Sequence, residues 1–120
     1  MSVARIDPAH LARELEANEE VLAALAENGD VASIVRSIDL HFKGAQTNIE
    51  MLASNAETLG LRFIGFAEFE DGDWAADLQT DSTADRETMT ELTRRALEIE
   101  LLHDVEFEGW GCHAETGLEN

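Results

Sequence analysis

Several features that commonly decide the class of a protein are missing from this sequence. Its 120 residues contain a single cysteine, Cys112, which excludes a disulfide within the chain. No apolar run approaches the roughly 20 residues that a membrane-spanning helix needs. The chain has neither flexible linkers nor internal repeats, which favours one domain over residues 1–120. Its first residues lack a signal-peptide pattern, so we expect a cytoplasmic protein.

Positive charge is also scarce. The sequence has 8 Lys and Arg against 26 Asp and Glu, for a formal net charge of -18. Such a surface repels phosphate groups, so we expect no direct binding of nucleic acid and no membrane contact. A basic segment of another protein is the natural partner. The competing interpretation is general solubility or a salt-loving host, since Lys43 is the only lysine.

The sequence predicts a first helix over residues 8–28. Asp7 can cap its N-terminus, Pro8 suits the first helical position, and Gly29 can end it. Leucines recur on one face of this helix, and the opposite face is acidic.

The core of the domain, about residues 33–115, alternates between strand and helix patterns. Period-two alternation predicts strands over 34–42, 61–69 and 74–80, and a last strand from about residue 104. Helical spacing predicts helices over 45–59 and 85–100, the second with a capping box of Ser82 and Asp85. Asp71 and Gly72 predict a hairpin.

This order, a helix followed by βαββαβ, predicts an α+β fold of the ferredoxin-like sandwich type. We expect four antiparallel strands in the order 4-1-3-2, with the last two helices on one face. The strand over residues 61–69 is apolar on both faces, with Phe63 and Ile64 as neighbours. We therefore expect the N-terminal helix to cover the other face of the sheet.

The histidines and the cysteine show no spacing typical of a metal site. The sequence has no HxxxH or CxxC motif, and Cys112 and His113 are neighbours whose side chains leave opposite faces of a strand. We expect no metal and no cofactor. A site built from His41, His103 and His113 is the alternative.

The abundant carboxylates give no catalytic signature either. Asp71, Asp73 and Asp77 fail the spacing of an EF-hand loop, and a solvated hairpin turn explains them better. The sequence also lacks a phosphate-binding loop and a GxSxG elbow. We therefore expect no catalytic site.

Gly109, Trp110 and Gly111 form the most distinctive motif. Glycines weaken a strand, so a tryptophan between them indicates a packing or binding role. Alternation places Trp110 on the same face as Glu106 and Glu108. Packing of Trp110 beneath a helix is one interpretation, and contact with an Arg-rich partner through ion pairs and cation–π contacts is the other.

The run from Asp104 to Gly111 resembles the C-terminal signature of the RraB family, the regulators of ribonuclease E activity B. Segments 38–42 and 45–60 and the turn at 70–73 are also similar to that family, and the resemblance spans about residues 10–115. It implies a single RraB-like domain with an α/β sandwich fold. It also implies a non-enzymatic bacterial protein that binds the basic, noncatalytic C-terminal scaffold region of ribonuclease E and inhibits RNA cleavage.

A smaller patch must supply specificity, because charge alone attracts many basic partners. We predict this partner-binding patch on the last strand and the hairpin turn, with Trp110 as anchor. Its residues are Glu106, Glu108, Trp110, Asp71 and Asp73. The alternative function is a small-ligand-sensing or catalytic α+β domain, because ferredoxin-like sheets host many activities.

Overall fold

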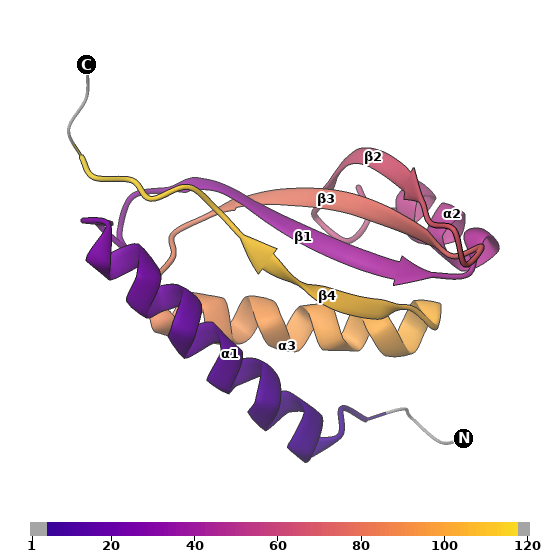
Figure 1. Cartoon of the computed structure of the whole chain (residues 1–120), viewed down its shortest axis with the longest axis horizontal. Helices are drawn as coiled ribbons and strands as arrows, with labels where there is room; N and C mark the ends of the chain where they lie inside the picture. The colour runs from indigo at the N-terminus through magenta and orange to yellow at the C-terminus, as the bar shows by residue number, and fades with distance from the viewer. Residues whose placement is uncertain (1–4, 118–120) are drawn as a thin grey trace.

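The computed structural model describes residues 5–117, which form three helices and four strands (Figure 1). The elements are α1 (Pro8–Glu27), β1 (Arg36–Gly44), α2 (Gln46–Asn55), β2 (Arg62–Glu68), β3 (Trp74–Ser82), α3 (Arg86–His103) and β4 (Glu106–Gly111). The order of helices and strands matches the expected helix followed by βαββαβ.

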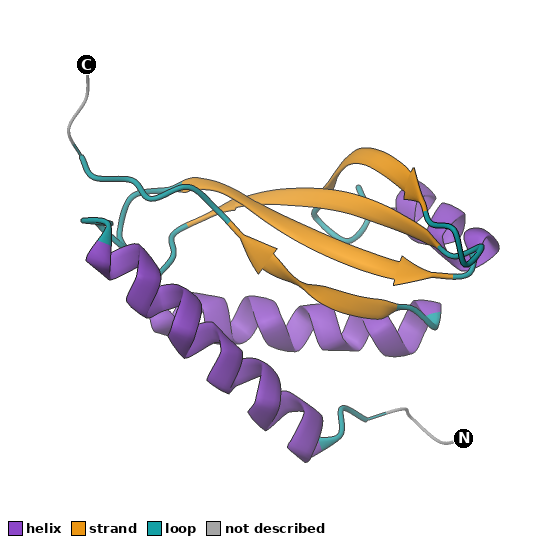
Figure 2. Cartoon of the chain, viewed as in Figure 1, coloured by secondary structure: helices purple, strands orange, loops and turns teal. Residues whose placement is uncertain are grey.

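The four strands form one antiparallel sheet in the order β2-β3-β1-β4 (Figure 2). This is the predicted order 4-1-3-2 read from the opposite edge, so the α+β sandwich is confirmed. β1 and β3 occupy the centre, and β2 and β4 are the edges.

The core lies between one face of the sheet and the helices. Alternate side chains of β1, namely Ile38, Leu40 and Phe42, are almost completely buried against this side. Helices α2 and α3 meet them with Ile49, Leu52, Met89 and Leu97. Burial of each such side chain contributes about 1.5–3 kcal/mol, which makes this layer the main source of stability.

The N-terminal helix does not cover the opposite face of the sheet, so that expectation is wrong. α1 packs along α3 instead (Figure 1). The Arg86 guanidinium donates to both carboxylate oxygens of Glu19, and Asn18 Nδ2 donates to Thr93 Oγ1 at 2.8 Å. Leu11 and Leu22 of the α1 stripe pack against the core, and no helix of the described chain covers the second face of the sheet.

The N-terminal end of α1 agrees with the sequence. Asp7 is the N-cap and accepts a hydrogen bond from the Ala9 N–H at 3.1 Å, and Pro8 is the first helical residue. The hairpin between β2 and β3 is also confirmed, with Gly72 at a φ of +90°.

α3 begins later and ends later than predicted. Its N-cap is Asp85, whose carboxylate accepts from the Thr88 N–H at 3.0 Å, whereas Ser82 is the last residue of β3. The predicted capping box is therefore wrong, because the pairing of β3 with β1 continues as far as Ser82. α3 ends at His103, and Asp104 follows in the left-handed conformation.

Neutralising the cap should lower stability in a pH-dependent way. The Thr83 hydroxyl, the Thr88 N–H and the Thr88 hydroxyl lower the pKa of Asp85 from 3.8 to about 2. The charged cap therefore stabilises the fold above pH 3.8, and this contribution is lost as the pH falls toward 2. We expect Asp85→Ala to cost about 1 kcal/mol at neutral pH in urea unfolding. The difference from the native chain should shrink as the pH falls from about 4 toward about 2, and Asp85→Asn should restore most of the stability at neutral pH.

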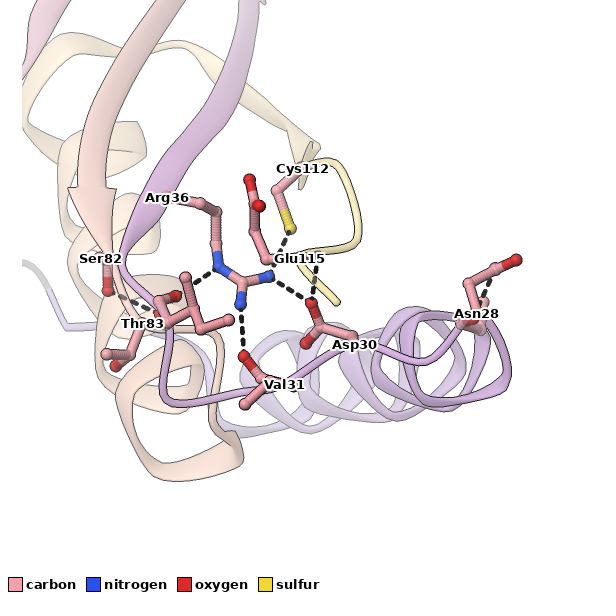
Figure 3. A network of polar contacts seen from close by, with 10 residues as sticks. Asn28, Asp30, Val31, Arg36, Ser82, Thr83, Cys112 and Glu115 are labelled. Atoms are coloured by element: carbon pink, nitrogen blue, oxygen red, sulfur yellow. Dashed lines mark hydrogen bonds and ion pairs between the residues drawn. The ribbon is translucent and has the colours of Figure 1, made fainter. Parts of the chain in front are cut away.

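A buried ion pair fixes the start of the central strand (Figure 3). The side chains of Arg36 and Asp30 are 2% and 4% exposed, and Arg36 Nη1 donates to Asp30 Oδ1 at 2.7 Å. The same guanidinium donates to the carbonyl oxygens of Ile34 and Val31, each at 2.8 Å. These bonds hold residues 31–34 in a turn, so β1 begins at Arg36 and not at Ile34.

The segment that follows β4 also contacts the Arg36–Asp30 ion pair and its neighbours. The Glu115 N–H donates to Asp30 Oδ1 at 2.8 Å, and the Val31 N–H donates to the Glu115 carbonyl at 2.6 Å. Burial alone would raise the pKa of Asp30, but the Glu115 N–H and the Arg36 guanidinium hold it below its ordinary value. The carboxylate is therefore charged at neutral pH and balances a cation that has lost its water.

Removal of Asp30 should destabilise the protein strongly. Asp30→Ala leaves the Arg36 charge buried without a counter-ion, for which we expect a loss of about 3–5 kcal/mol. Asp81→Ala is the matched control, because its ion pair with Arg62 lies in solvent and should change stability by less than about 1 kcal/mol. Urea unfolding of the two variants measures the contrast, and equal losses would contradict this account.

Candidate functional site

Most ionisable side chains of the four strands lie on the face of the sheet that points away from the described helices. Side chains that alternate with the core positions of β1 and β3 point away from the helices. We call this surface the acidic face. We define it by ten ionisable residues, of which Asp71 and Asp73 belong to the adjoining β2–β3 turn: Asp39, His41, Lys43, Arg62, Asp71, Asp73, Asp77, Asp81, Glu106 and Glu108. Seven carboxylates therefore stand against two permanent cations.

Cross-strand pairs join β1 to β3 across the centre of the acidic face. His41 Nδ1 lies 2.6 Å from Asp77 Oδ1, and the two side chains are 47% and 49% exposed. Gln79 Nε2 donates to Asp39 Oδ1 at 2.7 Å. These contacts hold the carboxylates at fixed positions while leaving them open to solvent.

One end of the acidic face is organised around Arg62 of β2. Its Nη2 donates to Asp81 Oδ1 at 2.9 Å and to Gln79 Oε1 at 3.3 Å. This contact lowers the pKa of Asp81, and the same pairing raises that of Arg62. Arg62 is therefore occupied internally and attracts external anions weakly.

Lys43 organises the other end. Its ammonium donates to Asp71 Oδ2 at 3.3 Å and lies 4.6 Å from the centre of the Phe69 ring. Asp71 raises the pKa of Lys43, with smaller contributions from Asp73 and Glu108. The Asp73 N–H, followed by Lys43, lowers the pKa of Asp71. The structure thus gathers three of the predicted carboxylates around one lysine.

Trp110 does not share the face of Glu106 and Glu108, so that assignment is wrong. Phe107 pairs with Phe42, but Gly109 pairs with His41 and Trp110 with Leu40, which leaves Glu108 as an additional residue. This β-bulge reverses the alternation and turns Trp110 toward the helices. Trp110 consequently packs against the core.

On the helix side of the sheet, a polar side chain accepts a hydrogen bond from the indole N–H of Trp110. Trp110 Nε1 donates to Asn18 Oδ1 at 2.7 Å, and Asn18 in turn donates to Thr93. Asn18 is only 5% exposed and joins α1, α3 and β4 at one point. This placement agrees with the interpretation that Trp110 packs beneath a helix.

The bulge depends on glycine at one position. Gly109 has a φ of +115°, which a residue with a Cβ adopts only with strain. We expect Gly109→Ala to cost about 1–3 kcal/mol and to weaken the Trp110 contact with Asn18. Gly111→Ala is the matched control, because Gly111 has no positive φ and an added Cβ meets nothing within 4 Å. Thermal unfolding and tryptophan fluorescence measure both effects, and equal melting temperatures would count against a strained position.

Glu106 completes the predicted set, since it pairs with Lys43 across β1 and β4. The structure therefore brings together Glu106, Glu108, Asp71 and Asp73 and separates Trp110 from them. Sequence reasoning missed Asp39, Asp77 and Asp81 as part of the surface. Strand alternation and the predicted central position of β1 and β3 contained the signal that could have identified them.

Among the described residues, the ionisable groups show no arrangement typical of a metal site. Within residues 5–117, no group of three His, Cys, Asp or Glu side chains is placed to hold a metal ion. Burial raises the pKa of the Cys112 thiol, although Arg36 Nη1 lies 3.9 Å from its sulfur. None of the helices described is long and apolar enough to cross a membrane.

The chain is similar to one known protein family over most of its length. The family model described as regulator of ribonuclease activity B matches residues 15–112. A protein named regulator of ribonuclease activity B, from Photobacterium profundum, is 27% identical over 110 residues, which cover 84% of this chain and 81% of that protein. The matched region extends from α1 to the residue after β4 and includes the whole sheet. The chain belongs to the RraB family of regulators of ribonuclease activity.

Proposed function

We propose that this protein is a non-catalytic, cytoplasmic regulator that binds ribonuclease E and restrains its cleavage of RNA. The contact joins the acidic face to a basic segment in the noncatalytic C-terminal region of the ribonuclease. Membership of the RraB family supports a ribonuclease as the partner. The observation that carries the proposal is a sheet face that no helix within residues 5–117 covers, on which seven carboxylates outnumber two paired cations.

Such a face suits arginine-rich segments. Carboxylates accept paired hydrogen bonds from a guanidinium, and the overall charge of -18 steers a basic segment toward the surface. The same charge repels RNA, so the regulator and RNA compete for one basic segment. Regulation then follows from occupancy of the segment and needs no chemistry on the RNA.

The carboxylates beside Lys43 test this proposal. We expect the double substitution Glu106→Gln and Glu108→Gln to weaken binding of the ribonuclease E C-terminal region about tenfold at low salt. Both side chains are exposed, so the stability should change by only about 0.5 kcal/mol. Isothermal titration calorimetry measures the affinity, and cleavage of a model RNA measures the inhibition.

A matched control separates local charge from total charge. Glu16→Gln with Glu20→Gln removes the same number of charges from exposed positions of α1, away from the acidic face. We expect this variant to keep most of the affinity. Equal losses in the two double variants would show that net charge alone directs binding, and absence of any complex with the native chain would refute the proposed function.

A further inference from the structure

The two edges of the sheet differ in how their backbone groups are used. At the β4 edge, the Phe107 N–H donates to Glu100 Oε2 at 2.6 Å, so a side chain of α3 occupies this edge. At the β2 edge, no group within residues 5–117 pairs with the outer side of the strand. Natural proteins commonly protect such edges, because an unpaired strand accepts another strand.

The unpaired edge is also apolar. Phe63, Ile64, Phe66 and Phe69 are 40%, 54%, 46% and 41% exposed. The rings of Phe63 and Phe66 lie 4.7 Å apart, and Phe66 meets Trp74 edge-on at 5.4 Å. Phe63 and Phe66 lie opposite the buried Leu78 and Ala76, yet α2 packs over β3 and β1 and leaves the rings at the rim.

The direction of the backbone amides follows from the hairpin. The Phe69 N–H donates to the Asp73 carbonyl and therefore points toward β3. Because N–H groups alternate along a strand, those of Glu68 and Phe66 point outward. An added strand would find these two donors on the same edge as the exposed rings.

The charge beside the edge indicates what kind of strand fits. Glu57, Glu68 and Glu70 are exposed near its two ends, and the cation Arg62 is paired with Asp81. A second copy of this chain would bring its own net charge of -18 to the same edge and would be repelled. A basic segment with apolar residues instead gains both ion pairs and ring contacts.

We propose that the outer edge of β2 accepts an extended segment of the partner as a fifth strand of the sheet. The segment has aromatic or branched apolar side chains, which pack on Phe63 and Phe66, and Arg or Lys residues, which face the carboxylates. This inference rests on the proposed function and adds a second contact of the same partner, at the edge of the sheet opposite β4. Main-chain hydrogen bonds contribute affinity in such strand addition, and the rings select the sequence.

A proline at the edge tests strand addition directly. Glu68→Pro removes an outward N–H without removing a bond to β3, and proline is tolerated at such edge positions. Glu68→Gln is the matched control, because it removes the charge and keeps the N–H. We expect Glu68→Pro to weaken binding of the ribonuclease E C-terminal region at least about tenfold, and Glu68→Gln to weaken it less than about threefold.

Hydrogen exchange of the native chain gives a second measurement that does not depend on folding of the proline variant. The amides of Phe66 and Glu68 should exchange rapidly in the free protein and slow at least about tenfold in the complex. A complex that leaves both amides unprotected, or that binds Glu68→Pro as tightly as the native chain, overturns strand addition while the proposed function stands. Absence of a complex defeats both.

Light scattering of the free protein tests the other possible occupant of the β2 edge, which is a second copy of this chain. If the chain forms dimers in about 1 M salt, where charge repulsion is screened, and Glu68→Pro abolishes them, the edge belongs to a second copy. The proposal of a partner strand is then overturned. We expect a monomer at every salt concentration.

Discussion

The buried charge of Arg36 constrains the whole end of the sheet where the chain enters it. A guanidinium without water must be matched by acceptors, and the α1–β1 connection supplies them. The C-terminal segment donates the Glu115 N–H to the Asp30 carboxylate and so holds one of these acceptors in place. β1 is a central strand, so its start also fixes the level at which β3 and β4 pair. The chain has only 8 Lys and Arg residues, and one of them, Arg36, is buried in a structural ion pair.

The division of the sheet into two faces was largely predictable. The period-two alternation that predicted the strand over residues 34–42 matches the burial of Ile38, Leu40 and Phe42, and the order of elements predicted the strand order. Four carboxylates of the candidate site, namely Asp71, Asp73, Glu106 and Glu108, were also predicted from the sequence, whereas Asp39, Asp77 and Asp81 were missed. These features depend on local periodicity and on general rules of chain connection, which a single sequence records well.

The errors arose where the structure depends on contacts between distant residues. An additional residue at Glu108 reverses the face of Trp110, and alternation alone cannot locate a bulge even with Gly109 as a hint. The apolar faces of β2 suggested a covered strand, but the helix expected there packs on α3 through Asn18 and Glu19. Sequence patterns show that a surface is apolar and do not show which element covers it.

The sequence has a single lysine, so a chemical label on its amine would report on one defined place in the structure. Lys43 carries the sole side-chain amine, and that amine lies on the acidic face beside Asp71. An amine-selective reagent therefore labels a single side chain in the surface at which a partner would dock. Because Asp71 raises the pKa of Lys43, we expect acylation of this amine to be slower than that of an unpaired lysine and to change when a ligand displaces the carboxylate.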